Sequence, residues 1–125
     1  QQLIHFSFKG DNGAWNCYAQ ALEDDQQFAF YSVLTVQAPV EKRPLMAEFI
    51  TRANYSLIIG NFEMDYDDGE IRYKTSIVVQ DSRLDSALIR QIVYSNLFRV
   101  DQYLPGISGV LESGLTPEQA IDRVE

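Results

Sequence analysis

The sequence has few of the residues that most often build catalytic and metal centres. Among its 125 residues there is one cysteine, Cys17, and one histidine, His5. A single cysteine excludes an internal disulfide and a cysteine-rich zinc site, and one histidine gives zinc too few ligands. A chain without disulfides suits a reducing compartment, so we expect a cytoplasmic protein.

Basic residues and long apolar runs are also scarce. Ten lysines and arginines are outnumbered by eighteen aspartates and glutamates, which gives a formal net charge of -8. Nucleic acids and anionic membrane surfaces bind clusters of basic residues, so we expect neither as a partner. No apolar run approaches the roughly 18 residues of a membrane-spanning helix, and we expect no signal peptide behind Gln1.

Apolar residues are plentiful enough to build a single folded domain over residues 1–125. They make up 46% of the chain, and aromatic residues make up 12%. This content can bury a sizeable core and disfavours a disordered chain. No repeat, low-complexity segment or linker divides the sequence.

Three strands are expected in the first third of the chain. Apolar and polar residues alternate over 4–9, and Asn12-Gly13 is a strong hairpin signal. A turn centred on that dipeptide pairs Phe8 with Cys17 and directs the cysteine toward the core. Residues 28–36 are rich in aromatic and β-branched side chains, as a third strand requires.

A second hairpin is expected near 57–67 and 70–80, with Asp68-Gly69 as a type I′ turn or with a four-residue loop from Asp67 to Glu70 in the same register. In this register opposite charges face each other in two pairs, Glu63 with Lys74 and Asp65 with Arg72. Apolar side chains occupy the other face. Pattern, pairing and turn chemistry therefore agree on a hairpin.

Helices are expected in three places. Pro44 opens an amphipathic helix that stops at Asn54. Apolar spacing over 84–104 predicts a long helix that Pro105 breaks or restarts, with a short helix to about Glu112 after it. Thr116 begins a capping box for a last helix, and Ser82 and Asp85 are spaced as another. The order β-β-β-α-β-β-α-α predicts an α+β fold with a mostly antiparallel five-stranded sheet and helices packed on one face.

The acidic hairpin tip is a candidate cation site. Its carboxylates are Asp65, Asp67, Asp68 and Glu70. An EF-hand is excluded, because Gly69 arrives one position too early, Ser76 stands where the final glutamate belongs, and the flanks are strands. Two interpretations stay open: a weak surface calcium site, and carboxylates that only stabilise a solvated turn.

No catalytic constellation emerges, so we expect no enzyme and no cofactor. His5 is expected on the polar side of its strand and Cys17 on the apolar side, where thiols are usually inert. The acidic run Glu23-Asp24-Asp25 is expected in a solvated turn, where nothing raises a carboxyl pKa. Walker, dinucleotide-binding and zinc-protease motifs are absent from the sequence.

One apolar surface stands out. In the expected registers six residues lie on the sheet face away from the helices: Leu57, Ile59, Val78, Tyr18, Tyr31 and Val33. Exposed apolar patches mark interaction sites. A preceding helix, a second copy in a homodimer or a protein partner could cover this one, while a register slip of one residue would remove it.

Several segments together resemble the YbjN-like family, most closely its cyanobacterial branch. They are Gly60-Asn61-Phe62-Glu63, Gly69-Glu70-Ile71-Arg72-Tyr73, Asp101-Gln102-Tyr103-Leu104-Pro105 and Gly114-Leu115-Thr116-Pro117-Glu118-Gln119-Ala120. The resemblance covers roughly residues 28–125. It implies a bacterial sensory-transduction regulator with a fold similar to type III secretion chaperones, which are small acidic dimers that bind segments of other proteins.

The resemblance also implies a helix before the first strand, which this sequence lacks, and no catalytic residues to carry over. We therefore expect a non-enzymatic, chaperone- or adaptor-like protein-interaction module that forms a homodimer. The alternative is a cation-responsive regulator that uses the tip from Asp65 to Glu70.

Overall fold

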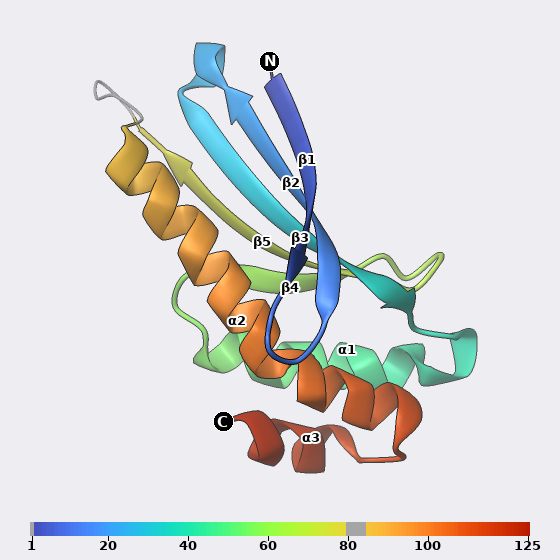
Figure 1. Cartoon of the computed structure of the whole chain (residues 1–125). Helices are drawn as coiled ribbons and strands as arrows, with labels where there is room; N and C mark the ends of the chain where they lie inside the picture. Colours follow the sequence, from blue (N-terminus) through green and yellow to red (C-terminus); the bar gives the residue numbers. More distant parts are fainter. Residues whose placement is uncertain (1, 80–84) are drawn as a thin grey trace.

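The computed structural model in Figure 1 describes residues 2–79 and 85–125 and shows one sheet with helices packed on one face. The strands are β1 (Gln2–Lys9), β2 (Ala14–Leu22), β3 (Gln27–Gln37), β4 (Asn61–Met64) and β5 (Glu70–Val78). The helices are α1 (Arg43–Ser56), α2 (Ser86–Glu112) and α3 (Pro117–Val124), with short 3₁₀ helices η1 (Glu23–Asp25) and η2 (Val40–Lys42). The five strands are antiparallel in the order β1-β2-β3-β5-β4, so the predicted fold class is confirmed.

The core lies between the sheet and the helices. Along β3, Phe28, Phe30, Ser32 and Leu34 are buried while the intervening residues are not, as a strand with one covered face requires. The long helix α2 packs across β3 and β5, and α1 packs on β4 and α3. Each large apolar side chain buried there contributes about 1.5–3 kcal/mol of transfer free energy.

Both hairpins form, but each predicted register is displaced by two residues. Phe8 pairs with Trp15 and Phe6 with Cys17, whereas Phe8 was expected opposite Cys17. Glu63 pairs with Arg72, and the loop between β4 and β5 is closed by Asp65 and Glu70. A displacement of two residues leaves each side chain on its predicted face, so the predicted core survives the error.

The predicted strand near 57–67 is wrong in its first four and its last three residues, because β4 spans only Asn61–Met64. Helix α1 continues to Ser56, and residues 57–60 connect it to β4, which begins at Asn61. Asn54 does not end the helix; its side-chain amide instead accepts from the N–H of Phe62 (2.8 Å) and donates to its carbonyl (3.0 Å). Tertiary bonds of this kind leave no trace in local sequence patterns.

Helix α2 runs through Pro105 without the predicted break. Proline cannot donate a hydrogen bond to the carbonyl four residues earlier, which is that of Asp101. In this structure the side-chain amide of Asn12 donates to that carbonyl over 2.9 Å. The hairpin tip thus supplies the hydrogen bond that the helix lacks, and the helix continues to Glu112.

Two of the predicted caps are present. The Asp85 carboxylate accepts from the N–H of Leu88 at the start of α2 (2.9 Å), and Thr116 and Gln119 form the predicted capping box of α3. The partner proposed for Asp85, Ser82, lies outside the described residues.

A buried polar chain fixes α2 on the sheet. The Asn96 amide donates to the carbonyls of Phe30 and Tyr73, both over 3.0 Å, and its oxygen accepts from Ser32 Oγ over 2.6 Å. Ser32 Oγ in turn accepts from the indole N–H of Trp15 over 2.9 Å. Because each of these groups would be costly to bury unpaired, α2 can dock in only one rotation.

Candidate interaction groove

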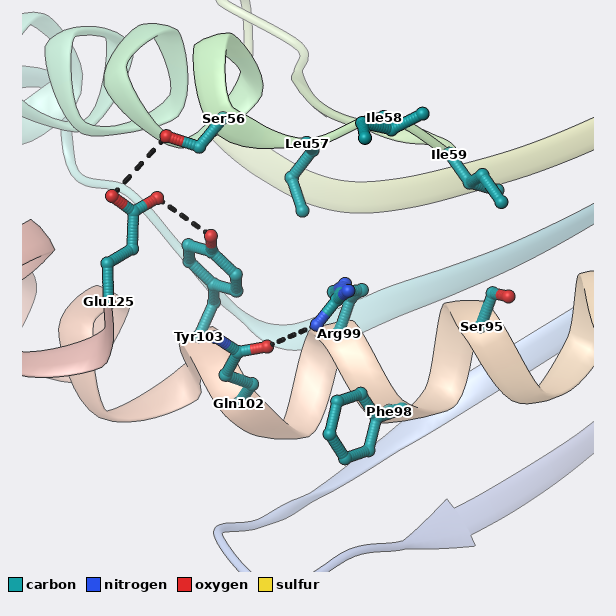
Figure 2. Close-up of a pocket in the computed structure, with 10 residues that line it drawn as sticks. All are labelled: Ser56, Leu57, Ile58, Ile59, Ser95, Phe98, Arg99, Gln102, Tyr103 and Glu125. Carbon is teal, nitrogen blue, oxygen red and sulfur yellow. Dashed lines mark hydrogen bonds between the residues drawn. The ribbon is translucent and has the colours of Figure 1, made fainter.

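A hollow of about 580 Å³ lies between α2, the connection from α1 to β4 and the last residue of the chain (Figure 2). We call it the α2 groove. Its lining residues are Ser56, Leu57, Ile58, Ile59, Ser95, Phe98, Arg99, Gln102, Tyr103 and Glu125. Volumes of several hundred Å³ are typical of sites that accept a ligand or a segment of a partner.

The floor of the groove is one face of α2. Ser95, Phe98, Arg99 and Gln102 recur at spacings of three and four, so they line one side of the helix. The Phe98 ring is 65% exposed, although this face of α2 adjoins the core. An apolar ring left so open at the rim of a hollow is a candidate anchor for a partner.

The opposite wall is the connection at residues 57–59. The hydroxyl of Tyr73 donates to the carbonyl of Ile59 over 2.7 Å and so ties the wall to β5. Burial raises the pKa of Tyr73 to about 12, which keeps the hydroxyl protonated and able to donate. Ile58 is 96% exposed and Ile59 54%, so both aliphatic side chains are available from solvent.

One end of the groove is polar. The Glu125 carboxylate accepts from the hydroxyl of Tyr103 over 2.8 Å and from Ser56 Oγ over 3.4 Å (Figure 2). Burial first, and then the hydrogen bond and the negative charge of Glu125, raise the pKa of Tyr103. The phenol therefore stays neutral and holds α2, α1 and the end of the chain together.

Arg99 places a positive charge inside the hollow. Its guanidinium rises from α2 toward the connection, donates to Gln102 Oε1 over 2.8 Å and lies 5.3 Å from the ring centre of Phe98 (Figure 2). Among the described residues no carboxylate lies within 4.0 Å of its nitrogens. The groove can therefore bind a carboxylate without first breaking an ion pair.

A second hollow of about 400 Å³ lies on the other side of Phe98, beside the β1–β2 hairpin. Phe8, Tyr94 and Leu97 line it together with Phe98, which is shared by both hollows. Tyr94 is 63% exposed. The Phe98 ring therefore stands between two hollows that lie on and beside α2.

The six residues predicted to form one interaction patch occupy two separate surfaces. Leu57 and Ile59 lie in the wall of the α2 groove and not on a strand, so their predicted place on the sheet is wrong. The remaining four lie on the outer sheet face as predicted: Tyr18, Tyr31, Val33 and Val78. The signal for the groove was weak in the sequence, because Phe98 and Arg99 are ordinary residues for an amphipathic helix.

Polar groups cover much of the outer face. Arg72 lies 4.8 Å above the Tyr31 ring, and Glu63 accepts from Arg72 over 2.7 Å and contacts Lys74 at 3.1 Å. Tyr31, Val33 and Tyr18 are consequently half-buried, whereas Val78 is 61% exposed. The outer face therefore presents less apolar surface than the sequence predicts.

His5 and Cys17 lie on opposite faces of the sheet. His5 is exposed and stacks on Tyr18 with ring centres 4.7 Å apart. Cys17 is fully buried, and desolvation raises the pKa of its thiol despite hydrogen bonds from Ser32 and Trp15. A protonated, inaccessible thiol is a poor nucleophile, in line with the predicted core position.

The acidic tip uses two of its carboxylates to build its own turn. Asp65 Oδ1 accepts from the N–H of Asp67, and Asp68 Oδ1 from the N–H of Glu70, both over 2.9 Å. Within residues 2–79 and 85–125, no three Asp, Glu, His or Cys side chains are grouped so that they could hold a metal ion. The predicted type I′ turn is wrong: only Gly69 of the central pair has positive φ.

No helix of the described chain is both long enough and apolar enough to cross a membrane. A search of curated proteins and a search of solved structures found no significant match. The family model named YbjN, described as "Putative bacterial sensory transduction regulator", matches residues 2–109. The match extends over the first hairpin, which the sequence resemblance left out, and stops before α3. Since it covers most of the 125 residues, the chain belongs to the YbjN family.

Proposed function

We propose that the protein is a non-catalytic regulator that binds another protein through the α2 groove. The observation that carries the proposal is the exposure of Ile58, Ile59 and Phe98 around one hollow. Monomeric proteins rarely leave such aliphatic and aromatic side chains together in water, and a partner that covers them gains hydrophobic free energy. The family description, which is that of a regulator, supports the role.

The chemistry of the groove also suggests the kind of segment it accepts. Apolar side chains would fill the space between Ile58 and Phe98, and a carboxylate would meet the guanidinium of Arg99, which forms no ion pair within the described residues. Elsewhere the net charge of -8 repels acidic partners, so a single acidic residue within an apolar segment fits better than an acidic stretch. The lone buried cysteine supports a cytoplasmic setting for this interaction.

The test is capture from a soluble extract of the source organism, with wild type, three groove variants and one control variant compared. Ile58→Lys and Phe98→Lys place a charge on the two sides of the groove, and Arg99→Gln removes its charge. Val40→Lys is the matched control, because Val40 is 69% exposed in η2 and outside the groove. Thermal unfolding would establish that each variant folds.

We expect a partner that wild type and Val40→Lys recover and that Ile58→Lys and Phe98→Lys lose. Arg99→Gln should weaken binding by about tenfold, the effect of one charge-assisted contact. A partner that binds all five proteins equally, or no partner at all, would contradict the proposal.

A further inference from the structure

The two edges of the sheet differ in how far their backbone groups are covered. The order β1-β2-β3-β5-β4 leaves β1 and β4 each with one free side. A free strand edge offers unpaired N–H and C=O groups to any other strand, and folded proteins usually cover or interrupt it. Which edge is covered therefore indicates where a second strand can pair.

The β4 edge is closed. The strand has only four residues, Asn61–Met64, and α1 packs beside it. The side-chain amide of Asn54 accepts from the N–H of Phe62 over 2.8 Å and donates to the carbonyl of Phe62 over 3.0 Å. These are the bonds that a neighbouring strand would make, so Asn54 occupies the place of one.

The β1 edge is open. The N–H of Gly10 bonds to the carbonyl of Gly13, and bonded pairs alternate along an antiparallel ladder. Phe8, Phe6 and Ile4 therefore bond to β2, which leaves the backbone groups of the alternate residues pointing outward: Leu3, His5, Ser7 and Lys9. Among the described residues no other strand pairs with β1.

The side chains along this edge are unusually apolar for a free strand. Leu3 is 63% exposed, Ile4 59% and Phe6 37%. The eight-residue strand contains no proline, and Lys9, its last residue, is its only charged residue. Devices that normally prevent edge pairing are thus missing over most of its length.

We propose that β1 of one copy pairs antiparallel with β1 of a second copy, so that two sheets join into one. A two-fold axis at His5 places Ile4 opposite Phe6 of the second copy, and Leu3 opposite Ser7 of the second copy. Each exposed apolar side chain on the helix-covered face then meets another, and the two Lys9 residues end up at opposite ends of the pairing. The pairing therefore satisfies the outward backbone hydrogen bonds, brings Ile4 and Phe6 together and keeps the two lysines apart.

This interface does not depend on the proposed groove function. Ile4 lines neither of the two hollows beside α2, and Ile58 is not on the β1 edge. A single strand pairing also buries less surface than a standard interface, so we expect a dimer that dissociates on dilution.

The test measures self-association of the whole chain by sedimentation velocity from micromolar to millimolar concentration. Ile4→Lys charges the edge at an already exposed position. Ser7→Pro removes an outward N–H without taking a bond from β2. Ile58→Lys is the matched control, with the same change at a more exposed isoleucine. Near-ultraviolet circular dichroism of the buried Trp15 would verify folding.

We expect wild type and Ile58→Lys to dimerise alike, and Ile4→Lys and Ser7→Pro to weaken dimerisation by about tenfold or more. Amide exchange gives a second readout: the N–H groups of His5 and Ser7 should exchange more slowly as concentration rises, while those of Ile4 and Phe6 should not change. A chain that stays monomeric, or a dimer unaffected by both edge variants with no added protection at His5, would overturn the proposal. Partner capture by the Ile4→Lys variant would still test the groove separately.

Discussion

The tips of the two hairpins are both turns rich in Asp, Asn and Gly, yet they are held in different ways. The β1–β2 tip is held by α2: the Asp101 carboxylate accepts from the N–H groups of Asp11 (3.1 Å) and Asn12 (2.8 Å). In return, the Asn12 side chain donates to the Asp101 carbonyl. This tip is therefore shaped by a residue that lies about ninety positions away in the chain.

The β4–β5 tip is held by its own residues, by Ala38 just after β3 and by Arg43 at the start of α1. Asp65 and Asp68 bond to backbone N–H groups within the loop. The carbonyl of Gly69 accepts from the N–H of Ala38 over 2.9 Å, and Arg43 donates to the carbonyl of Tyr66 over 3.2 Å. The comparison shows that turns of similar composition can be stabilised either by hydrogen bonds within the turn or by a residue far away in the sequence.

The largest loss of stability is expected at the β4–β5 tip, from Gly69→Ala. Gly69 has φ +80°, and a Cβ there would collide with the carbonyl of Ala38. Strain and collision together should reduce the free energy of unfolding by about 3 kcal/mol, measured by urea denaturation. Gly114→Ala is the control, since φ is +71° there but the Cβ meets nothing within 4 Å. Equal losses in both variants would contradict the packing argument.

The β1–β2 tip should be destabilised most by Asp101→Ala. The change removes the acceptor of two backbone N–H groups, which should reduce the free energy of unfolding by about 2 kcal/mol. Amide exchange should accelerate at Asp11 and Asn12 and stay unchanged at Asp67 and Glu70. Acceleration at both tips would mean that the hairpins are not held independently.

The link between this tip and α2 can be measured with a double-mutant cycle of Asn12→Ala and Pro105→Ala. Asn12→Ala alone should cost about 1 kcal/mol, because it leaves the Asp101 carbonyl without its donor. In the Pro105→Ala background the helix regains its own N–H donor, so the same change should cost less. Additive costs, determined from urea denaturation of the four proteins, would rule out the proposed exchange of hydrogen bonds.

The smallest loss of stability is expected from Glu63→Gln in the β4–β5 hairpin, and it should depend on pH. Burial alone would raise the pKa of Glu63, but hydrogen bonds and charges from Lys74 and Arg72 outweigh burial and lower it. A carboxyl whose pKa falls on folding stabilises above its unfolded pKa and loses that contribution as pH falls through its folded pKa. Glu63→Gln should therefore reduce stability at pH 7 by about 0.5 kcal/mol. The difference from wild type should vanish in strong acid; a difference independent of pH would exclude the ion pair as its cause.

The same comparison explains what could be predicted from the sequence. Alternation of apolar residues located all five strands and the buried face, because burial is a property of each strand's own pattern. The first register was missed because Asp101 binds the N–H groups of Asp11 and Asn12, so these two residues form the turn and not Asn12 and Gly13. The second was missed because Asp65 and Glu70 close the loop, which puts Gly69 at the end of the turn and not at its centre. The displacement is even in both hairpins, so every side chain kept its face.

The continuity of α2 and the α2 groove depend on tertiary contacts and could not be predicted in this way. Pro105 is a helix breaker in any local analysis, and only the Asn12 amide removes that conflict. The groove exists because Tyr73 holds Ile59 and Tyr103 holds Glu125, contacts between residues far apart in sequence. The sequence pattern placed six apolar residues on one sheet face, whereas the structure places Leu57 and Ile59 in the groove wall and the other four on the sheet.

The polar chain from Trp15 to Asn96 has an optical consequence. Trp15 is the single tryptophan, it is 1% exposed, and its indole N–H ends the chain of bonds that fixes α2 on the sheet. Its fluorescence in the native protein should be blue-shifted, and any event that lifts α2 from the strands should shift the emission to the red without an added label. The protein thus carries its own reporter for whether a ligand seated beside α2 leaves the helix docked or moves it.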